Sequence, residues 1–182
     1  MVRNYKKDGK RDSGFVTKKW MVRTSFKPGD IGSLTALHGT IYAKEYGLDH
    51  TFEAYVAAGL AQFLQSFHPK KDRAWVAEIN DQIIGMIAIA GQSKGESQLH
   101  WFLVHPDFRR CGLGTELLRE ALLFCKKCKY KTVFLWTIND LRAAGRLYTC
   151  AGFRKTQEKT HDRWGRRVTE ERYELHISDT SE

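Results

Sequence analysis

The chain has 182 residues, and 42% of them are hydrophobic, which suits a single globular domain with a substantial core. The formal net charge of +9 is unevenly placed, because residues 1–20 carry seven Lys/Arg against two Asp and the other 162 residues carry only +4. That modest remainder predicts no specific nucleic-acid binding. The sequence has no run of about eighteen apolar residues and no apolar leader. We therefore expect a cytoplasmic protein that does not associate with membranes.

Composition divides the chain into two parts. Residues 1–18 are polar, basic and glycine-containing, which predicts a flexible basic tail too short to fold independently. Residues 19–182 are expected to form one domain, with no regulatory domain before it. Within that domain Cys125 and Cys128 lie on one predicted helix, and no second pair completes a zinc site. We expect packed, reduced thiols and no metal.

The hydrophobic periodicity of the domain changes several times along the chain, between helical spacing and alternation. In order it predicts a strand over Trp20–Thr24, helices over Ile31–Tyr46 and Thr51–Phe67, strands over Ala74–Glu78, Ile83–Ala90 and Glu96–Val104, a helix over Leu113–Cys128, a strand over Thr132–Thr137, a helix over Leu141–Cys150, and strands over Phe153–Arg163 and Val168–Ile177. The three strands in the middle are expected to be antiparallel, and the next strand should join by a right-handed parallel crossover. The predicted class is α+β (α/β), with a mixed, mostly antiparallel sheet flanked by helices.

Short polar residues mark the predicted helix starts and turns. Asp30 or Ser33 is expected to cap the first helix, and Asp140 the last one. Asn80-Asp81 predicts a tight turn between two strands, and Trp164-Gly165-Arg166 predicts the final hairpin.

The most informative stretch joins the third middle strand to the next helix. Its sequence is Arg109-Arg110-Cys111-Gly112-Leu113-Gly114-Thr115, a basic, glycine-containing loop that runs into the first turn of an amphipathic helix. The first turn of a helix has unpaired backbone N–H groups and a partial positive charge, so it attracts anions. Glycines permit close approach to a ligand, and arginines add charge-assisted contacts. This junction predicts a phosphate site.

The pattern Arg109-x-x-Gly112-x-Gly114 resembles the Gln/Arg-x-x-Gly-x-Gly/Ala signature of the GNAT N-acetyltransferase superfamily, as does the element order over about Lys19–Ile177. Some GNAT domains are fused to winged-helix regulators, and none is expected here. The resemblance implies a GNAT-like fold and acetyl-CoA as acyl-donor co-substrate. It also implies that residues around the loop and the preceding strand bind this co-substrate: Leu103, Val104, Arg109, Arg110, Cys111, Gly112, Leu113, Gly114, Thr115, Asn139 and Ala144.

A second motif, Ala144-x-x-Leu147-Tyr148-x-x-x-Gly152-Phe153, resembles the superfamily helix whose tyrosine stands near the cofactor sulfur. The resemblance implies that Tyr148 protonates the leaving thiolate, and that the Val104 N–H is the oxyanion donor. A tyrosine that only packs a helix on the sheet is the alternative interpretation.

Two positions depart from the superfamily pattern. Leu141 stands where an asparagine is common, and Gln98 stands where a glutamate often serves as base. Glu78 is a candidate base, and Glu96, Glu45 and His100 are further candidates. Glu45 is also expected to contact the ammonium group of the substrate, with an ordinary solvated side chain as the alternative.

The resemblance therefore implies transfer of an acetyl group from acetyl-CoA to an amine by direct attack in a ternary complex. The alternative is a non-catalytic, CoA-sensing or partner-binding GNAT-like module, suggested by Gln98 and Leu141. The expected partner is a small-molecule or peptide amine, and a homodimer is left open. The identity of the acceptor amine, the base, the acyl-chain preference and the role of the tail are not determined by the sequence.

Overall fold

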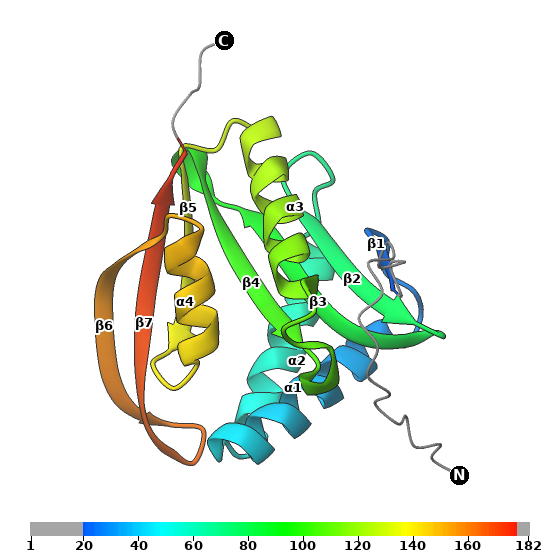
Figure 1. The fold of residues 1–182 in the computed structure, drawn as a ribbon, viewed down its shortest axis with the longest axis vertical. Helices are drawn as coiled ribbons and strands as arrows, with labels where there is room; N and C mark the ends of the chain where they lie inside the picture. The colour runs from blue at the N-terminus through cyan, green and yellow to red at the C-terminus, as the bar shows by residue number, and fades with distance from the viewer. Residues whose placement is uncertain (1–19, 178–182) are drawn as a thin grey trace, which may run out of the picture.

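The computed structural model describes residues 20–177, so the predicted tail over residues 1–18 lies outside the described part. One seven-stranded sheet has the order β1-β2-β3-β4-β5-β7-β6 (Figure 1). The elements are β1 (Met21–Arg23), α1 (Asp30–Tyr46), α2 (His50–Gln65), β2 (Arg73–Ile79), β3 (Gln82–Gly91), β4 (Glu96–Val104), α3 (Leu113–Lys127), β5 (Thr132–Ile138), α4 (Arg142–Cys150), β6 (Arg154–Arg163) and β7 (Arg166–His176). The predicted order of elements and the mixed α+β class are confirmed.

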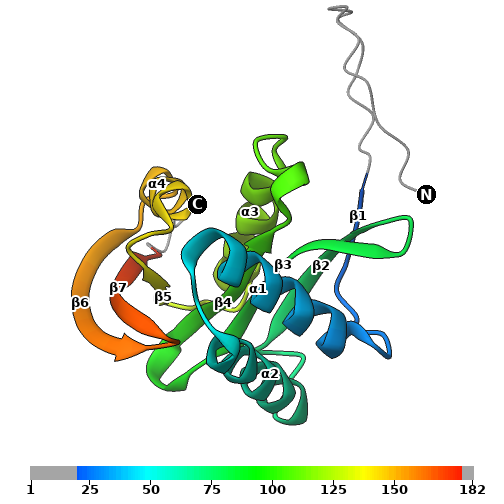
Figure 2. The same ribbon diagram turned by 90° about the horizontal axis from the view of Figure 1, so that it is seen from below.

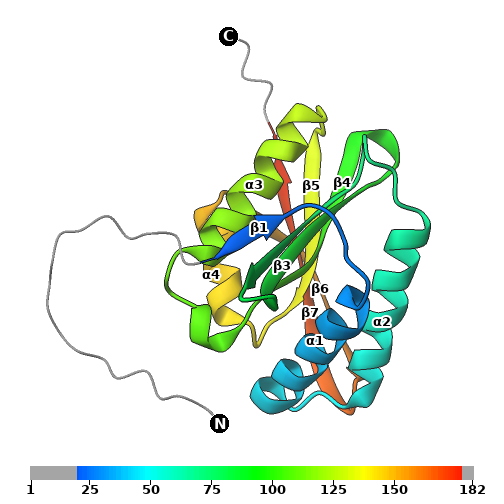
Figure 3. The ribbon, with the colours of Figure 1, turned by 90° about the vertical axis from the view of Figure 1, so that its right-hand side faces the viewer.

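Helices cover both faces of the sheet. α1 and α2 lie on one face, and α3 and α4 lie on the other (Figures 2 and 3). Each face has its own apolar core: Leu34, Val56 and Leu60 pack on the α1–α2 face, whereas Leu113, Leu117 and others pack on the α3 face. The regular apolar stripes of α1, α2 and α3 account for this arrangement, because each stripe is buried against the sheet.

Two predicted helix caps are wrong. The N-cap of α1 is Gly29, with φ 93°, and the Asp30 carboxylate instead accepts the backbone N–H of Lys27 at 2.7 Å. The N-cap of α4 is Leu141, and Asp140 forms an ion pair with Arg166. In both cases another group binds the carboxylate that was expected to accept an N–H of the first helical turn. For Asp30 this group is a loop amide, and for Asp140 it is a guanidinium.

The last two strands form a hairpin that folds back toward α2. Trp164 and Gly165 both have positive φ, 54° and 80°, which suits the two-residue turn predicted here. The Trp164 carbonyl accepts the N–H of Asp49 at 3.0 Å, and its ring meets Phe52 edge-on at 5.1 Å. The turn is thereby anchored at the start of α2.

The middle of the sheet is interrupted where β4 and β5 meet. These parallel strands pair only over Glu96–Leu99 and Thr132–Leu135 within the described residues. Beyond Leu99, strand β4 has a bulge at Trp101, whose φ is 47°, and its pairing with β3 shifts register there. The second half of β4 therefore has β3 on one side and an open edge on the other.

Candidate active site

A cleft of about 660 Å³ lies at the open edge of β4. It is bounded by the second half of α1, the end of β4, the following loop, and the first turns of α3 and α4. Eight residues predicted from the sequence to bind the co-substrate border it: Leu103, Val104, Arg109, Arg110, Gly112, Gly114, Thr115 and Ala144. The structure thus brings together parts of the chain that are about forty residues apart in sequence.

The first turn of α3 provides an anion site at one end of this cleft. Gly112 is the N-cap, with φ 96°, and no side chain caps the helix. A Cβ placed on Gly112 would meet nothing within 4 Å, so the space over these backbone amides is open. Free N–H groups, a helix dipole and the Arg109 and Arg110 side chains together fit a pyrophosphate.

The edge of β4 offers a second kind of contact. His105 N donates to Ile84 O at 2.7 Å, which makes Gly85 and Val104 a non-hydrogen-bonded pair of the antiparallel ladder. The N–H and C=O of Val104 consequently point away from β3, toward the open edge. Arg109 Nε confirms this direction, since it donates to Val104 O at 3.1 Å. An extended ligand with amide groups can pair with such an edge as an added strand.

Tyr148 lies in the last turn of α4 and is buried, with only 4% of its surface exposed. Its ring packs against Phe102 and Tyr173, at 6.0 and 5.9 Å between ring centres. Burial, followed by the nearby Tyr42, raises the pKa of the Tyr148 phenol well above its usual value. The hydroxyl therefore keeps its proton at neutral pH.

Tyr148 also borders a second, smaller pocket of about 110 Å³. This pocket, which we call the aromatic pocket, lies between α1, α2 and the diverging ends of β4 and β5, and the β6–β7 turn closes it. Its walls are largely rings, contributed by His38, Tyr42, Phe52, Tyr55, His100, Trp101, Phe102, Trp136, Tyr148 and Trp164. It adjoins the cleft, because Tyr42, Phe102, Leu141 and Ala144 border both.

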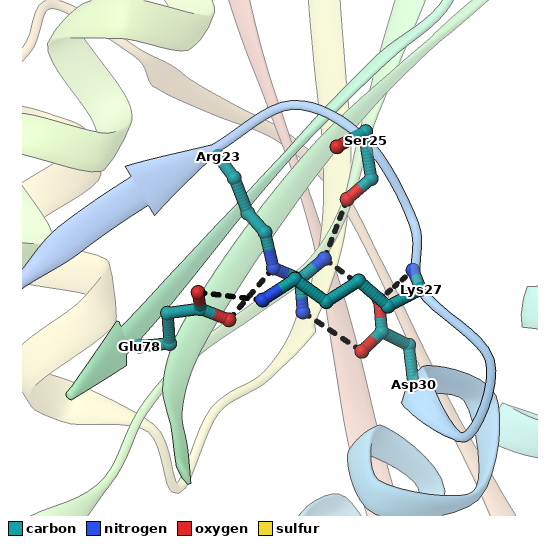
Figure 4. A network of polar contacts seen from close by, with 5 residues as sticks. All are labelled: Arg23, Ser25, Lys27, Asp30 and Glu78. Atoms are coloured by element: carbon teal, nitrogen blue, oxygen red, sulfur yellow. Dashed lines mark hydrogen bonds and ion pairs between the residues drawn. The ribbon is translucent and has the colours of Figure 1, made fainter. Parts of the chain in front are cut away.

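The candidate base Glu78 lies elsewhere, in a polar network between β1, β2 and the start of α1 (Figure 4). Its carboxylate accepts Arg23 Nε at 2.7 Å and Lys27 Nζ at 2.9 Å, while Arg23 also donates to Asp30 at 2.8 Å. Hydrogen bonds from Arg23 and Lys27 lower the pKa of Glu78. Glu78 does not border the cleft or the aromatic pocket. These contacts indicate a structural role rather than proton abstraction.

Other predicted site residues also lie outside the cleft. Leu113 is fully buried in the core, Cys111 is exposed on the loop, and the Asn139 N–H donates to Thr169 O in a turn. The Glu45 carboxylate, expected to contact the substrate ammonium, instead forms an ion pair with Arg109. None of these four residues borders the cleft.

The sequence analysis missed Tyr42 and Tyr46, which border the cleft from α1. Both belong to the apolar stripe of α1, and their spacing alone does not distinguish a site wall from core. Only the packing of α1 across the open edge of β4 assigns them to the site.

Within residues 20–177 no group of three or more His, Cys, Asp or Glu is placed to hold a metal ion, and no helix there is long and apolar enough to cross a membrane. The Cys125 thiol is buried 3.6 Å from Ser97 Oγ, and burial raises its pKa to about 12. It is a core thiol.

This combination of a split sheet, a helix N-terminus and an open strand edge suits an anionic ligand that carries an extended chain of amides. Residues 39–153 match the model of the acetyltransferase (GNAT) family. The chain therefore belongs to the GNAT family of acetyltransferases.

Similar proteins agree with this membership. The Xenopus laevis protein named "Probable N-acetyltransferase camello" is 29% identical over 133 residues, which are 68% of this chain and 60% of that protein. The chain thus spans about 60% of the length of the camello proteins that it matches. A GNAT-family acetyltransferase from Staphylococcus aureus has the same fold, with a TM-score of 0.72 at 19% identity, over 87% of this chain and 99% of that one. An acetyltransferase from Bacillus anthracis, solved with acetyl coenzyme A, has a TM-score of 0.54 at 19% identity over 64% and 69% of the chains.

Proposed function

We propose that this protein is an N-acetyltransferase that moves an acetyl group from acetyl-CoA to an amine by direct attack in a ternary complex. The proposal rests on one observation: the first turn of α3 and the open edge of β4 border the same cleft. The uncapped first turn of α3 suits a pyrophosphate, and the open edge of β4 suits an extended chain of amides. The family membership and the acetyl-CoA complex of the Bacillus anthracis relative support the same ligand.

In this proposal the amides from Arg110 to Thr115 hold the pyrophosphate, and Arg109 and Arg110 add charge. Leu103 and Val104 on β4 hold the extended arm, which leads toward Tyr148. Gly114 borders the cleft where a Cβ would only make ordinary van der Waals contact, 3.6 Å from both Leu147 and Phe102, so this position accepts a small residue. Of the remaining predicted residues, Cys111 and Leu113 contribute backbone amides of the Arg110–Thr115 segment and Ala144 borders the cleft, whereas Asn139 lies outside the cleft with its N–H bonded to Thr169 O.

Acetyl-CoA would supply the thioester that carries the acetyl group. The Val104 N–H faces the open edge and is available to donate to the carbonyl oxygen as it gains negative charge. Tyr148 keeps its proton at neutral pH and borders the aromatic pocket, which adjoins the cleft; in this proposal it donates its proton to the departing sulfur.

The acceptor amine is proposed to enter the aromatic pocket, next to the cleft. No protein base is assigned, since Glu78 and Glu45 are held in ion pairs and Glu170, which borders the pocket, pairs with His161. The ammonium group loses one proton to water before attack, and a second nitrogen proton leaves to solvent as the amide forms; Tyr148, having protonated the thiolate, regains a proton from solvent. We retain the cytoplasmic location as a prediction.

A CoA-binding module without transfer chemistry is the second candidate. Gln98 borders the aromatic pocket at a position where the superfamily often has a glutamate, and an amide cannot accept a proton at neutral pH. This candidate predicts acetyl-CoA binding without turnover.

A turnover assay separates the two candidates. The protein is incubated with acetyl-CoA and a panel of small alkyl amines, aromatic amines and lysine peptides, and free CoA thiol is measured. We expect thiol release that depends on an amine and exceeds hydrolysis alone. Binding of acetyl-CoA without release for any amine would favour the CoA-binding module.

A further inference from the structure

His38 lies on α1 at the wall of the aromatic pocket, and 2% of its surface is exposed. Its Nδ1 lies 2.8 Å from the carbonyl oxygen of Leu34, one helical turn earlier. A carbonyl only accepts hydrogen bonds, so Nδ1 carries the hydrogen. The edge of the ring that bears Nε2 is therefore turned away from the helix backbone.

Nε2 is buried, carries a lone pair, and has no hydrogen-bond partner among residues 20–177. Burial lowers the pKa of His38 to about 4, so the ring is neutral at physiological pH and Nε2 stays free of a proton. A buried acceptor without a donor is unfavourable unless a ligand or water supplies one. His38 thus combines a buried, unpaired Nε2 with a place in the wall of the aromatic pocket.

The surroundings of this lone pair suit a cationic or polar N–H group on an apolar stem. Tyr42 stacks on His38 at 6.1 Å between ring centres, and Tyr42 borders both the pocket and the cleft. Aromatic faces attract ammonium groups. The volume of about 110 Å³ is below the roughly 150 Å³ of a cavity that binds benzene, so only a short, unbranched alkyl stem fits.

We infer that His38 is a substrate-contacting residue: Nε2 accepts a hydrogen bond from the amino group of an unbranched primary alkyl amine bound in the aromatic pocket. This inference rests on the proposed function for the identity of the pocket as the acceptor site. It adds the atom that orients the amine and the class of amine selected. Branched or secondary amines are disfavoured by the narrow pocket.

Two substitutions separate Nε2 from Nδ1. In His38→Gln the amide reaches about as far as Nε2, and in His38→Asn it reaches only about as far as Nδ1. We expect His38→Asn to raise KM for ethylamine by about tenfold or more, as for a lost hydrogen bond to a charged group, and His38→Gln to restore most of the affinity. The KM for acetyl-CoA should stay within about twofold in both.

Thr35→Val is the matched control, because Thr35 Oγ1 is also buried and unpaired on α1 but does not border the pocket. It should leave KM for the amine unchanged. Equal values of KM for the amine in the wild type, His38→Asn and His38→Gln would overturn the inference, provided that all three proteins unfold at similar temperatures.

A readout without turnover keeps the inference separate from the proposed function. In protein labelled with ¹⁵N-histidine, with CoA present, the Nε2 signal of His38 should move when ethylamine is added, while Nδ1 stays protonated. A shift without acetyl transfer would refute the proposed function and support the pocket assignment. Transfer with no shift and no effect of His38→Asn would refute the assignment alone.

Discussion

Arg109 and Glu45 connect the loop after β4 to α1 across the mouth of the cleft, with 2.8 Å between Arg109 Nη1 and Glu45 Oε2. The same guanidinium donates through Nε to Val104 O. One arginine therefore contacts the strand edge, the helix and the proposed phosphate site. Glu45, predicted from the sequence to contact the substrate, serves here as its counter-ion.

Glu45→Gln should tighten acetyl-CoA binding several-fold at low salt. The change removes a carboxylate that competes with phosphate for Arg109, and it leaves the cleft shape intact. Stability should change little, by about 0–1 kcal/mol, because the pair is partly exposed. Arg109→Gln is the opposite control and should weaken binding. Calorimetry at two salt concentrations measures both effects, and weaker binding by Glu45→Gln would contradict this role.

Glu78→Gln tests whether that carboxylate is a base or a structural element. Its partners Arg23 and Lys27 would face a neutral amide, and we expect a loss of about 2–4 kcal/mol in the free energy of unfolding. At a temperature where the variant is folded, kcat should stay within about twofold, since Glu78 borders neither the cleft nor the aromatic pocket but a separate pocket of about 580 Å³ beside the start of α1. A fall in kcat of about 10² or more with normal folding would restore Glu78 as the base.

The fold was largely predictable because its signals are local. The amphipathic stripe of α3, the Asn80-Asp81 turn and the Trp164-Gly165 turn each depend on neighbouring residues alone. The insertion of β7 between β5 and β6 was not predicted, since no local pattern encodes strand order. The predicted caps at Asp30 and Asp140 were wrong for a related reason. The groups that bind these carboxylates are a loop amide and Arg166, and Arg166 is remote in sequence from Asp140.

Tyr148→Phe separates a catalytic hydroxyl from a packing ring. The ring contacts with Phe102 and Tyr173 remain, so stability should shift little. If the hydroxyl protonates the thiolate, kcat should fall by about 10²–10⁴, with little change in acetyl-CoA affinity. Single-turnover kinetics is the suitable measurement, because product release can mask the chemical step. An unchanged single-turnover rate would assign Tyr148 to the core.

Stability should fall between pH 6.5 and pH 4 because of His38 and His100. Burial lowers the pKa of each to about 4, so the unfolded chain binds protons in this range and the folded protein does not. The stabilisation is complete above pH 6.5 and is lost as the pH falls, by up to about 3 kcal/mol for each histidine at pH 4. The lowered pKa of Glu78 adds acid sensitivity only below its usual value of 4.5.

Urea unfolding at pH 7, 6 and 5 measures this slope in the window where the histidines dominate. The double variant His38→Phe, His100→Phe should show a flatter dependence on pH than the wild type. The same slope in both proteins would mean that other groups titrate in this range.

The site was only partly predictable. The loop from Arg109 to Thr115 and the end of β4 were predicted from the spacing of glycine and arginine along the chain, and most of their residues border the cleft. The aromatic pocket was not, because its walls come from α1, α2, β4, β5, α4, β7 and a turn. His38 had no distinguishing signal, since an unpaired Nε2 is a property of the packed structure and not of the sequence around it.

The most direct test of the account is calorimetric titration of acetyl-CoA into wild type, Gly112→Val and Gly29→Val. Gly112 and Gly29 are both left-handed N-caps, with φ of 96° and 93° and open space at the Cβ position, but only Gly112 borders the cleft. Both variants should lose similar stability through backbone strain. The account predicts saturable binding by wild type and Gly29→Val and at least tenfold weaker binding by folded Gly112→Val. Equal affinity in all three proteins, or no binding by wild type at millimolar acetyl-CoA, would contradict it.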